Sequence, residues 1–80
     1  KGEIFMPDID KLILKMKRQP NGIRFQELAK VLEYNGYTMK PKKGTSHRNF
    51  INKSGDVITI KEDNPLKAVY VKDVLKRIGE

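Results

Sequence analysis

A single histidine, His47, stands in the most basic stretch of the sequence, KPKKGTSHRNF at residues 40–50. Histidine is the side chain whose charge changes most readily near neutral pH, so it can accept or donate a proton during a reaction. Lysine and arginine side chains nearby can neutralise the charge of a phosphate group. The combination indicates proton transfer beside a site for polyanions, and the alternative is a surface histidine without that role.

Cleavage of RNA without a metal ion needs this set of groups. The 2′-hydroxyl must lose a proton, the phosphorane must be stabilised, and the 5′-oxygen must gain a proton. His47 could serve as the base or the acid, while the lysines and Arg48 could bind phosphate. The turn residues Gly44, Thr45 and Ser46 could offer backbone N–H groups to a phosphate oxygen. The second proton carrier stays open between water, a lysine and a tyrosine.

Other kinds of reactive site fit the sequence less well. The chain has no cysteine and no second histidine, so thiol chemistry is excluded and neither a transition-metal site nor a cofactor is expected. The carboxylates of Asp56, Glu62 and Asp63 are spread over a turn and a loop rather than paired. The sequence GTSH at residues 44–47 is not the strained G-x-S-x-G turn of a serine hydrolase.

Positive charge is concentrated around the histidine. The 80 residues include 17 lysines and arginines against 10 aspartates and glutamates, a net charge of +7. Residues 38–53 hold five of the basic residues and none of the acidic ones. This distribution favours an anionic partner over an evenly charged, solubilising surface. No apolar run is long enough for a membrane span and no secretory signal is visible, so we expect a cytoplasmic protein without a membrane partner.

Two helices are predicted ahead of the basic segment. The first, over residues 8–17, is indicated by apolar residues at helical spacing: Ile9, Leu12, Ile13 and Met16. A break at PNG, residues 20–22, separates it from a second helix within residues 23–37. The buried stripe of the second helix is Phe25, Leu28, Ala29 and Leu32. Gly36 is suited to the left-handed conformation that ends a helix.

Three strands and a closing helix follow. Alternating side chains predict a strand over residues 37–42, which Pro41 restricts to a sheet edge or a strand end. Further strands are predicted over residues 46–52 and 57–60, joined by a turn at KSGD. Apolar residues from Tyr70 to Ile78 predict the last helix.

This order of elements predicts an α+β fold with an open sheet face. An antiparallel three-stranded sheet between two helices usually carries both helices on one face. If Phe50 points toward the helices, Arg48 shares its side, whereas His47 and Asn49 point to the open face. The basic and polar side chains expected together on that face are Lys40, Lys42, His47 and Asn49.

The segments NGYTMKPKKGTSHRNF, GDVITI and NPLKAVYVKDVLKRIG resemble the HicA family of bacterial toxins. The matching features are Gly36-Tyr37, Gly44 with Ser46-His47 and Phe50, the strand from Val57 to Ile60, and Tyr70-Val71 with Val74-Leu75. Thr45 separates Gly44 from Ser46, where the tightest form of the motif has Gly next to Ser. The third strand ends in TIKEDNP, without the second histidine often found there in the family.

The resemblance implies a metal-independent mRNA interferase with an α-β-β-β-α fold like that of a double-stranded-RNA-binding domain. It implies a catalytic role for His47 on the open sheet face. It also implies a single domain over residues 1–80, with a core at 25–80 and an extra helix at 8–17. The residues expected to bind RNA are Lys40, Lys42, Lys43, Gly44, Thr45, Ser46, Arg48 and Asn49.

The expected partners are single-stranded mRNA and a HicB-like antitoxin protein that covers the basic face and His47. Sheet-edge pairing, for example along the strand containing Pro41, is one means of contact. Two other interpretations stay open: an RNA-binding module that needs the basic face but not the histidine, and a structural subunit that binds an acidic protein.

Overall fold

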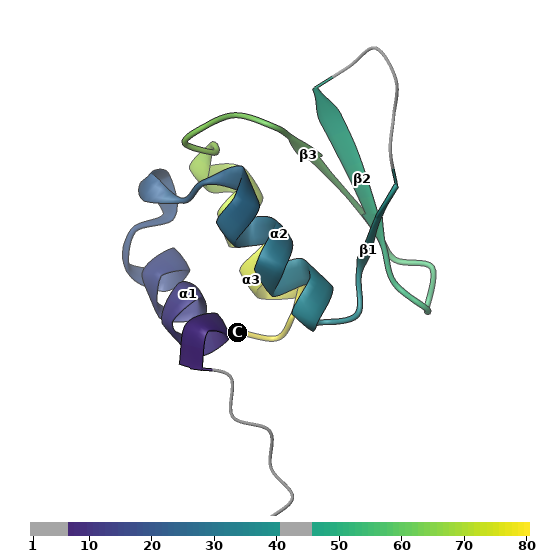
Figure 1. The fold of residues 1–80 in the computed structure, drawn as a ribbon, viewed down its shortest axis with the longest axis horizontal. Coiled ribbons are helices and arrows are strands. Elements are labelled where there is room, and N and C mark those ends of the chain that lie inside the picture. Colours follow the sequence, from purple (N-terminus) through teal and green to yellow (C-terminus); the bar gives the residue numbers. More distant parts are fainter. Residues whose placement is uncertain (1–6, 41–45) are drawn as a thin grey trace, which may run out of the picture.

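The computed structural model describes residues 7–40 and 46–80 (Figure 1). Its helices and strands, in chain order, are α1 (Pro7–Arg18), α2 (Phe25–Tyr34), β1 (Thr38–Lys40), β2 (His47–Ile51), β3 (Val57–Lys61) and α3 (Ala68–Arg77). A short 3-10 turn, Pro20–Gly22, joins α1 to α2. The strands form one antiparallel sheet in the order β1-β2-β3, which confirms the predicted α+β fold.

The molecule has three layers. Helices α2 and α3 lie between the sheet and α1, and no described helix lies on the other face of the sheet (Figure 1). The rings of Phe25 in α2 and Phe50 in β2 pack with their centroids 6.1 Å apart. Other fully buried side chains come from every layer and include Met16, Leu28, Leu32, Ile60, Val71 and Val74. One hydrophobic core therefore fixes the inner face of the sheet against the helices.

Helix α2 begins where two distant parts of the chain meet. The Phe25 N–H, which has no partner within its own helix, donates to Asn64 Oδ1 at 2.9 Å. The Leu66 N–H donates to the carbonyl of Ile23 at 2.7 Å. The loop between β3 and α3 is thus fastened to the start of α2.

The end of α2 leads directly into the sheet. Gly36 has a φ of +90°, the left-handed conformation predicted for it. The next N–H, that of Tyr37, donates to the carbonyl of Leu32 at 3.0 Å, as in a Schellman motif. This turn delivers the chain into β1 with Tyr37 buried against the core.

At one end of the sheet, a polar cluster joins the two edge strands, β1 and β3, to α3. The Tyr37 hydroxyl donates to Asp56 Oδ2 at 2.6 Å, and Arg77 Nη1 donates to Asp56 Oδ1 at 2.7 Å. Arg77 also pairs with Asp73 at 3.1 Å and donates to the carbonyl of Val57 at 3.2 Å. The hydroxyl of Tyr37, followed by Arg77, holds the pKa of Asp56 below its ordinary value.

The element boundaries differ from the predicted ones by few residues. Strand β3 extends to Lys61 rather than ending at residue 60, and α3 begins at Ala68 rather than near Tyr70. In α2, Val31 is fully buried while Ala29 is half-buried, because the buried face is rotated from the predicted stripe. Within the described ranges, no helix is both long and apolar enough to cross a membrane.

Candidate functional site

The strand register divides the sheet into two faces. Phe50 is fully buried, and its cross-strand partners Met39 and Ile58 share its side facing the helices. Because side chains alternate along a strand, the neighbouring positions point away from the helices. We call the outward set the open face: Thr38, Lys40, His47, Asn49, Ile51, Val57, Thr59 and Lys61.

The side chains of the open face are arranged in three cross-strand rows. At one end His47 pairs with Lys61, and at the other Ile51 lies between Thr38 and Val57. The middle row is Lys40, Asn49 and Thr59. Positive charge therefore lies in the His47 row, at Lys61, and in the middle row, at Lys40, whereas aliphatic surface, including Val57 at 46% exposure, lies at the opposite end.

None of the eight side chains on the open face is acidic. His47 and Lys40 are exposed and Lys61 is half-buried. Directly opposed side chains on one face have Cβ atoms about 5 Å apart. A phosphate at the His47 end would therefore meet a proton carrier and a cation at close range, with no carboxylate on the same face to repel it.

The middle row contains a side-chain hydrogen bond. Thr59 Oγ1 donates to Asn49 Oδ1 at 2.7 Å across β2 and β3. Both side chains are accessible, since Thr59 is exposed and Asn49 is half-buried. The bond restricts the rotation of the Asn49 amide on a surface that otherwise faces solvent.

The structure brings some of the predicted RNA-binding residues together and separates another. Lys40, His47 and Asn49 share the open face, as the alternation predicted. Arg48 points to the opposite side, where its Nη2 lies 3.0 Å from Glu62 Oε1 and its Nη1 donates to the His47 carbonyl at 3.1 Å. Arg48 thus contacts the backbone of His47 rather than extending the row of cations.

Of residues 41–46, between β1 and β2, the structure describes Ser46 alone. Ser46 is exposed, and its carbonyl accepts the Glu62 N–H at 2.8 Å, which continues the pairing of β2 with β3. The other predicted RNA-binding residues of this segment, Lys42, Lys43, Gly44 and Thr45, lie outside the described residues.

Sequence reasoning missed Thr59 and Lys61 as members of the open face. The pattern predicted a strand over VITI without indicating its outward positions, and that strand ended at residue 60, before Lys61. Strict alternation starting from a buried Ile58 would have found both.

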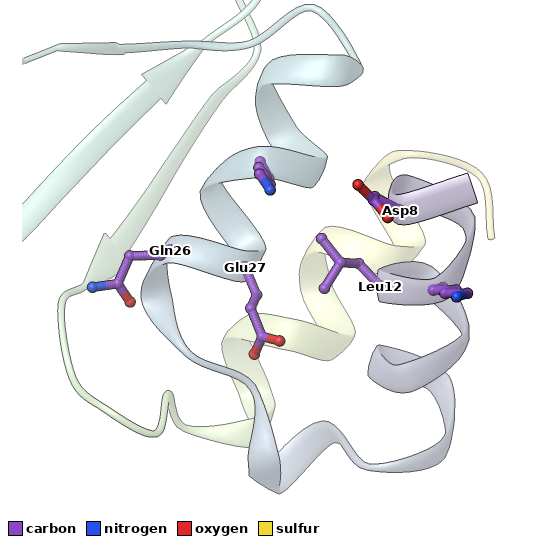
Figure 2. Close-up of a pocket in the computed structure, with 6 residues that line it drawn as sticks. Asp8, Leu12, Gln26 and Glu27 are labelled. Atoms are coloured by element: carbon purple, nitrogen blue, oxygen red, sulfur yellow. The ribbon is translucent and has the colours of Figure 1, made fainter. Parts of the chain in front are cut away.

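A separate open groove lies between α1 and α2 (Figure 2). It is lined by Asp8, Lys11, Leu12, Gln26, Glu27 and Lys30, and Figure 2 shows Leu12 reaching from α1 toward α2. Glu27 already accepts a hydrogen bond from the Arg24 N–H and pairs with Lys15 at 2.9 Å. These contacts give Glu27 a structural role, and no predicted site residue lines the groove.

Metal-binding groups are not clustered in the part of the chain that the structure describes. There, no three histidine, cysteine, aspartate or glutamate side chains lie close enough to hold a metal ion. The chemistry available on the open face is accordingly that of an imidazole, two ammonium groups and neutral hydrogen-bonding side chains.

Comparison with known proteins gives one match. A protein-family model described as the HicA toxin of bacterial toxin–antitoxin matches residues 25–80, which span α2, the sheet and α3 and exclude α1. Searches of curated proteins and of solved structures each return no match.

Proposed function

Because the chain belongs to the HicA toxin family of bacterial toxin–antitoxin systems, we propose that it is an endoribonuclease that cleaves mRNA at the open face. Membership of this family makes the chain the toxin of a pair whose other member is an antitoxin. The proposal adds the substrate, the reaction and the residues that carry it out.

The observation that supports the proposal most strongly is the surrounding of His47. An exposed histidine lies directly across the sheet from Lys61 and one row from Lys40, on a face without acidic side chains. An imidazole can transfer a proton, and the two ammonium groups stabilise negative charge that develops on a phosphate. The proposed RNA-binding set also includes Asn49 and Ser46, with Lys42, Lys43, Gly44 and Thr45 from the sequence between β1 and β2. Arg48 supports the set indirectly, by donating to the His47 carbonyl from the other side of β2.

In the proposed mechanism His47 transfers a proton at the scissile phosphate and Lys61 neutralises the phosphorane. No metal ion is required, because proton transfer and charge stabilisation both come from side chains. The tyrosines are poor second proton carriers: Tyr37 is buried and bonded to Asp56, while Tyr34 and Tyr70 belong to the helices. The second proton is therefore assigned to Lys61 or to water.

The proposed protein partner is a HicB-like antitoxin that covers the open face. An acidic surface would complement Lys40 and Lys61 and would bury His47, which would block access of RNA. The outer edge of β1 is proposed for strand pairing with that partner, because among the described strands β1 pairs only with β2. Both toxin and mRNA would meet in the cytoplasm.

The proposal is tested by incubating the protein and its His47→Ala variant with a long single-stranded RNA in EDTA. We expect cleavage by the wild type that leaves 2′,3′-cyclic phosphate ends, and a rate at least about 10²-fold lower for the variant. The free energy of unfolding in urea should differ between the two proteins by no more than about 0.5 kcal/mol, because His47 is exposed.

Two results would contradict the proposal. Equal cleavage by the wild type and His47→Ala, purified in parallel, would show that the observed cleavage does not depend on His47. Salt-sensitive RNA binding by both proteins without cleavage would identify an RNA-binding module in which His47 has no catalytic role.

A further inference from the structure

We propose that the Asn49–Thr59 pair reads an adenine next to the phosphate held at His47. This inference rests on the proposed function and adds a sequence preference to it. It arises from the middle row of the open face, where a hydrogen-bonded amide lies opposite Lys40 and between the His47–Lys61 row and the aliphatic row.

The position of the pair suits a base rather than a phosphate. Asn49 lies two residues from His47 on the same face of β2, a separation of about 6.7 Å along the strand. Beyond it, Ile51 and Val57 provide aliphatic surface on which the face of a base ring can pack. A nucleotide that places its phosphate at His47 and Lys61 would thus extend its base toward Asn49.

The hydrogen bond gives the Asn49 amide a fixed orientation. Thr59 Oγ1 occupies one lone pair of Asn49 Oδ1, which leaves that oxygen with a second lone pair and Nδ2 with two N–H donors. A neighbouring donor and acceptor held in one plane complement the edge of adenine, which offers an N6–H donor beside a ring-nitrogen acceptor. Thr59 has a restricted χ1 because it is β-branched, so the orientation is set before RNA binds.

A purely structural role explains the pair less well. Both side chains lie on the face directed away from the core, and the backbone of β2 and β3 is already paired along all five residues. A hydrogen bond between two accessible neutral side chains adds little to the stability of such a ladder. We therefore assign this hydrogen bond the role of orienting the Asn49 amide toward a ligand.

The test maps the cleavage sites of the wild type, Asn49→Ala, Asn49→Asp and Thr59→Val on an RNA that presents every dinucleotide equally. The wild type should favour adenine at one position beside the cut by at least about fivefold. Asn49→Ala and Thr59→Val should reduce that preference to less than about twofold. Asn49→Asp should shift it toward cytosine, because a carboxylate accepts from the cytosine amino group.

Thr38→Val is the matched control, since it removes a hydroxyl from the same face one row away. It should leave the adenine preference unchanged. The inference is overturned if the wild type cleaves without base preference, or if the preference survives both Asn49→Ala and Thr59→Val. Those outcomes leave the proposed function intact, whereas absence of His47-dependent cleavage in the wild type would refute both.

Discussion

Lys61 is the cation that lies directly across the sheet from His47, and its proposed task is to hold the scissile phosphate. Each phosphate contact on a single strand contributes about −0.7 to the slope of log affinity against log salt concentration. We therefore expect Lys61→Ala to weaken RNA binding and to make that slope shallower by about 0.7. Filter binding of a labelled RNA between 50 and 200 mM salt, in the His47→Ala background, measures both the affinity and the slope.

Lys11→Ala removes the same charge from α1, on the far side of the helices from the sheet (Figure 1). Affinity should fall slightly through the lower net charge, with an unchanged slope. Equal changes in slope for the two variants would mean that RNA is held by overall charge and not by the open face.

The contacts of Arg48 cannot be predicted from the distribution of charge along the sequence. Arg48 was predicted among the RNA-binding residues because it follows His47 in a basic segment. Alternation predicted its side chain on the Phe50 side of β2, where it does lie, but its ion pair with Glu62, 14 positions along the chain, was not predicted. Pairing with a distant acid depends on the register of β2 with β3, which composition does not report.

The helices and strands could be predicted from the sequence more fully than the contacts between them. Alternation around Phe50 predicted which face carries Lys40, His47 and Asn49, because an aromatic anchor in a core leaves only one choice of side. The capping of Phe25 by Asn64 joins residues 39 positions apart and has no local signal in the sequence. The Thr59–Asn49 bond likewise required the β2–β3 register before it could be recognised.

The connection between β1, the β2–β3 turn and α3 depends on the ionisation of Asp56 and Tyr37. The pKa of Asp56 is lowered, so the stability that it contributes is complete above about pH 4 and is lost as the pH falls through that lowered value. The pKa of Tyr37 is raised, first by its bond to Asp56 and then by burial, so its contribution is complete below about pH 10 and is lost as the pH rises further. We expect the wild type to have a higher free energy of unfolding than Asp56→Asn at neutral pH. Urea unfolding between pH 3 and pH 11 should show this difference becoming smaller at the acidic end.

Tyr37→Phe provides the second arm of this experiment. It should be less stable than the wild type at neutral pH, and the difference should change at alkaline pH, where Tyr37 ionises in the wild type. Glu33→Gln, at an exposed position of α2, should give a nearly constant difference across the range. A constant difference for Asp56→Asn as well would show that its bonds to Tyr37 and Arg77 do not stabilise the fold.

In the whole molecule, one face of the sheet is open to solvent and the three helices pack on its other side. Helix α1 lies outside the family match, and it covers the side of α2 and α3 that faces away from the sheet. Met16 of α1 is fully buried, whereas Leu14 of the same helix is 53% exposed. The helix therefore stabilises the layer behind the site without reaching the site itself.

Met16→Ala should lower the free energy of unfolding by about 2–5 kcal/mol, because it opens a cavity in the core. Leu14→Ala on the exposed side should change it by less than about 0.5 kcal/mol. RNA cleavage per folded molecule should be the same in both variants and in the wild type, measured well below the unfolding transition. A selective loss of cleavage in folded Met16→Ala would indicate that α1 transmits an effect to the sheet.

The absence of acidic side chains from the open face also governs how copies of the protein meet. Two copies approaching through this face would bring Lys40 and Lys61 of one against the same cations of the other. An uncovered sheet with exposed Val57 is otherwise a candidate for self-association, and charge at such a surface is a common safeguard against it. The charges proposed to attract RNA would thus also keep the free protein dispersed, and this protection would end when a polyanion neutralises them.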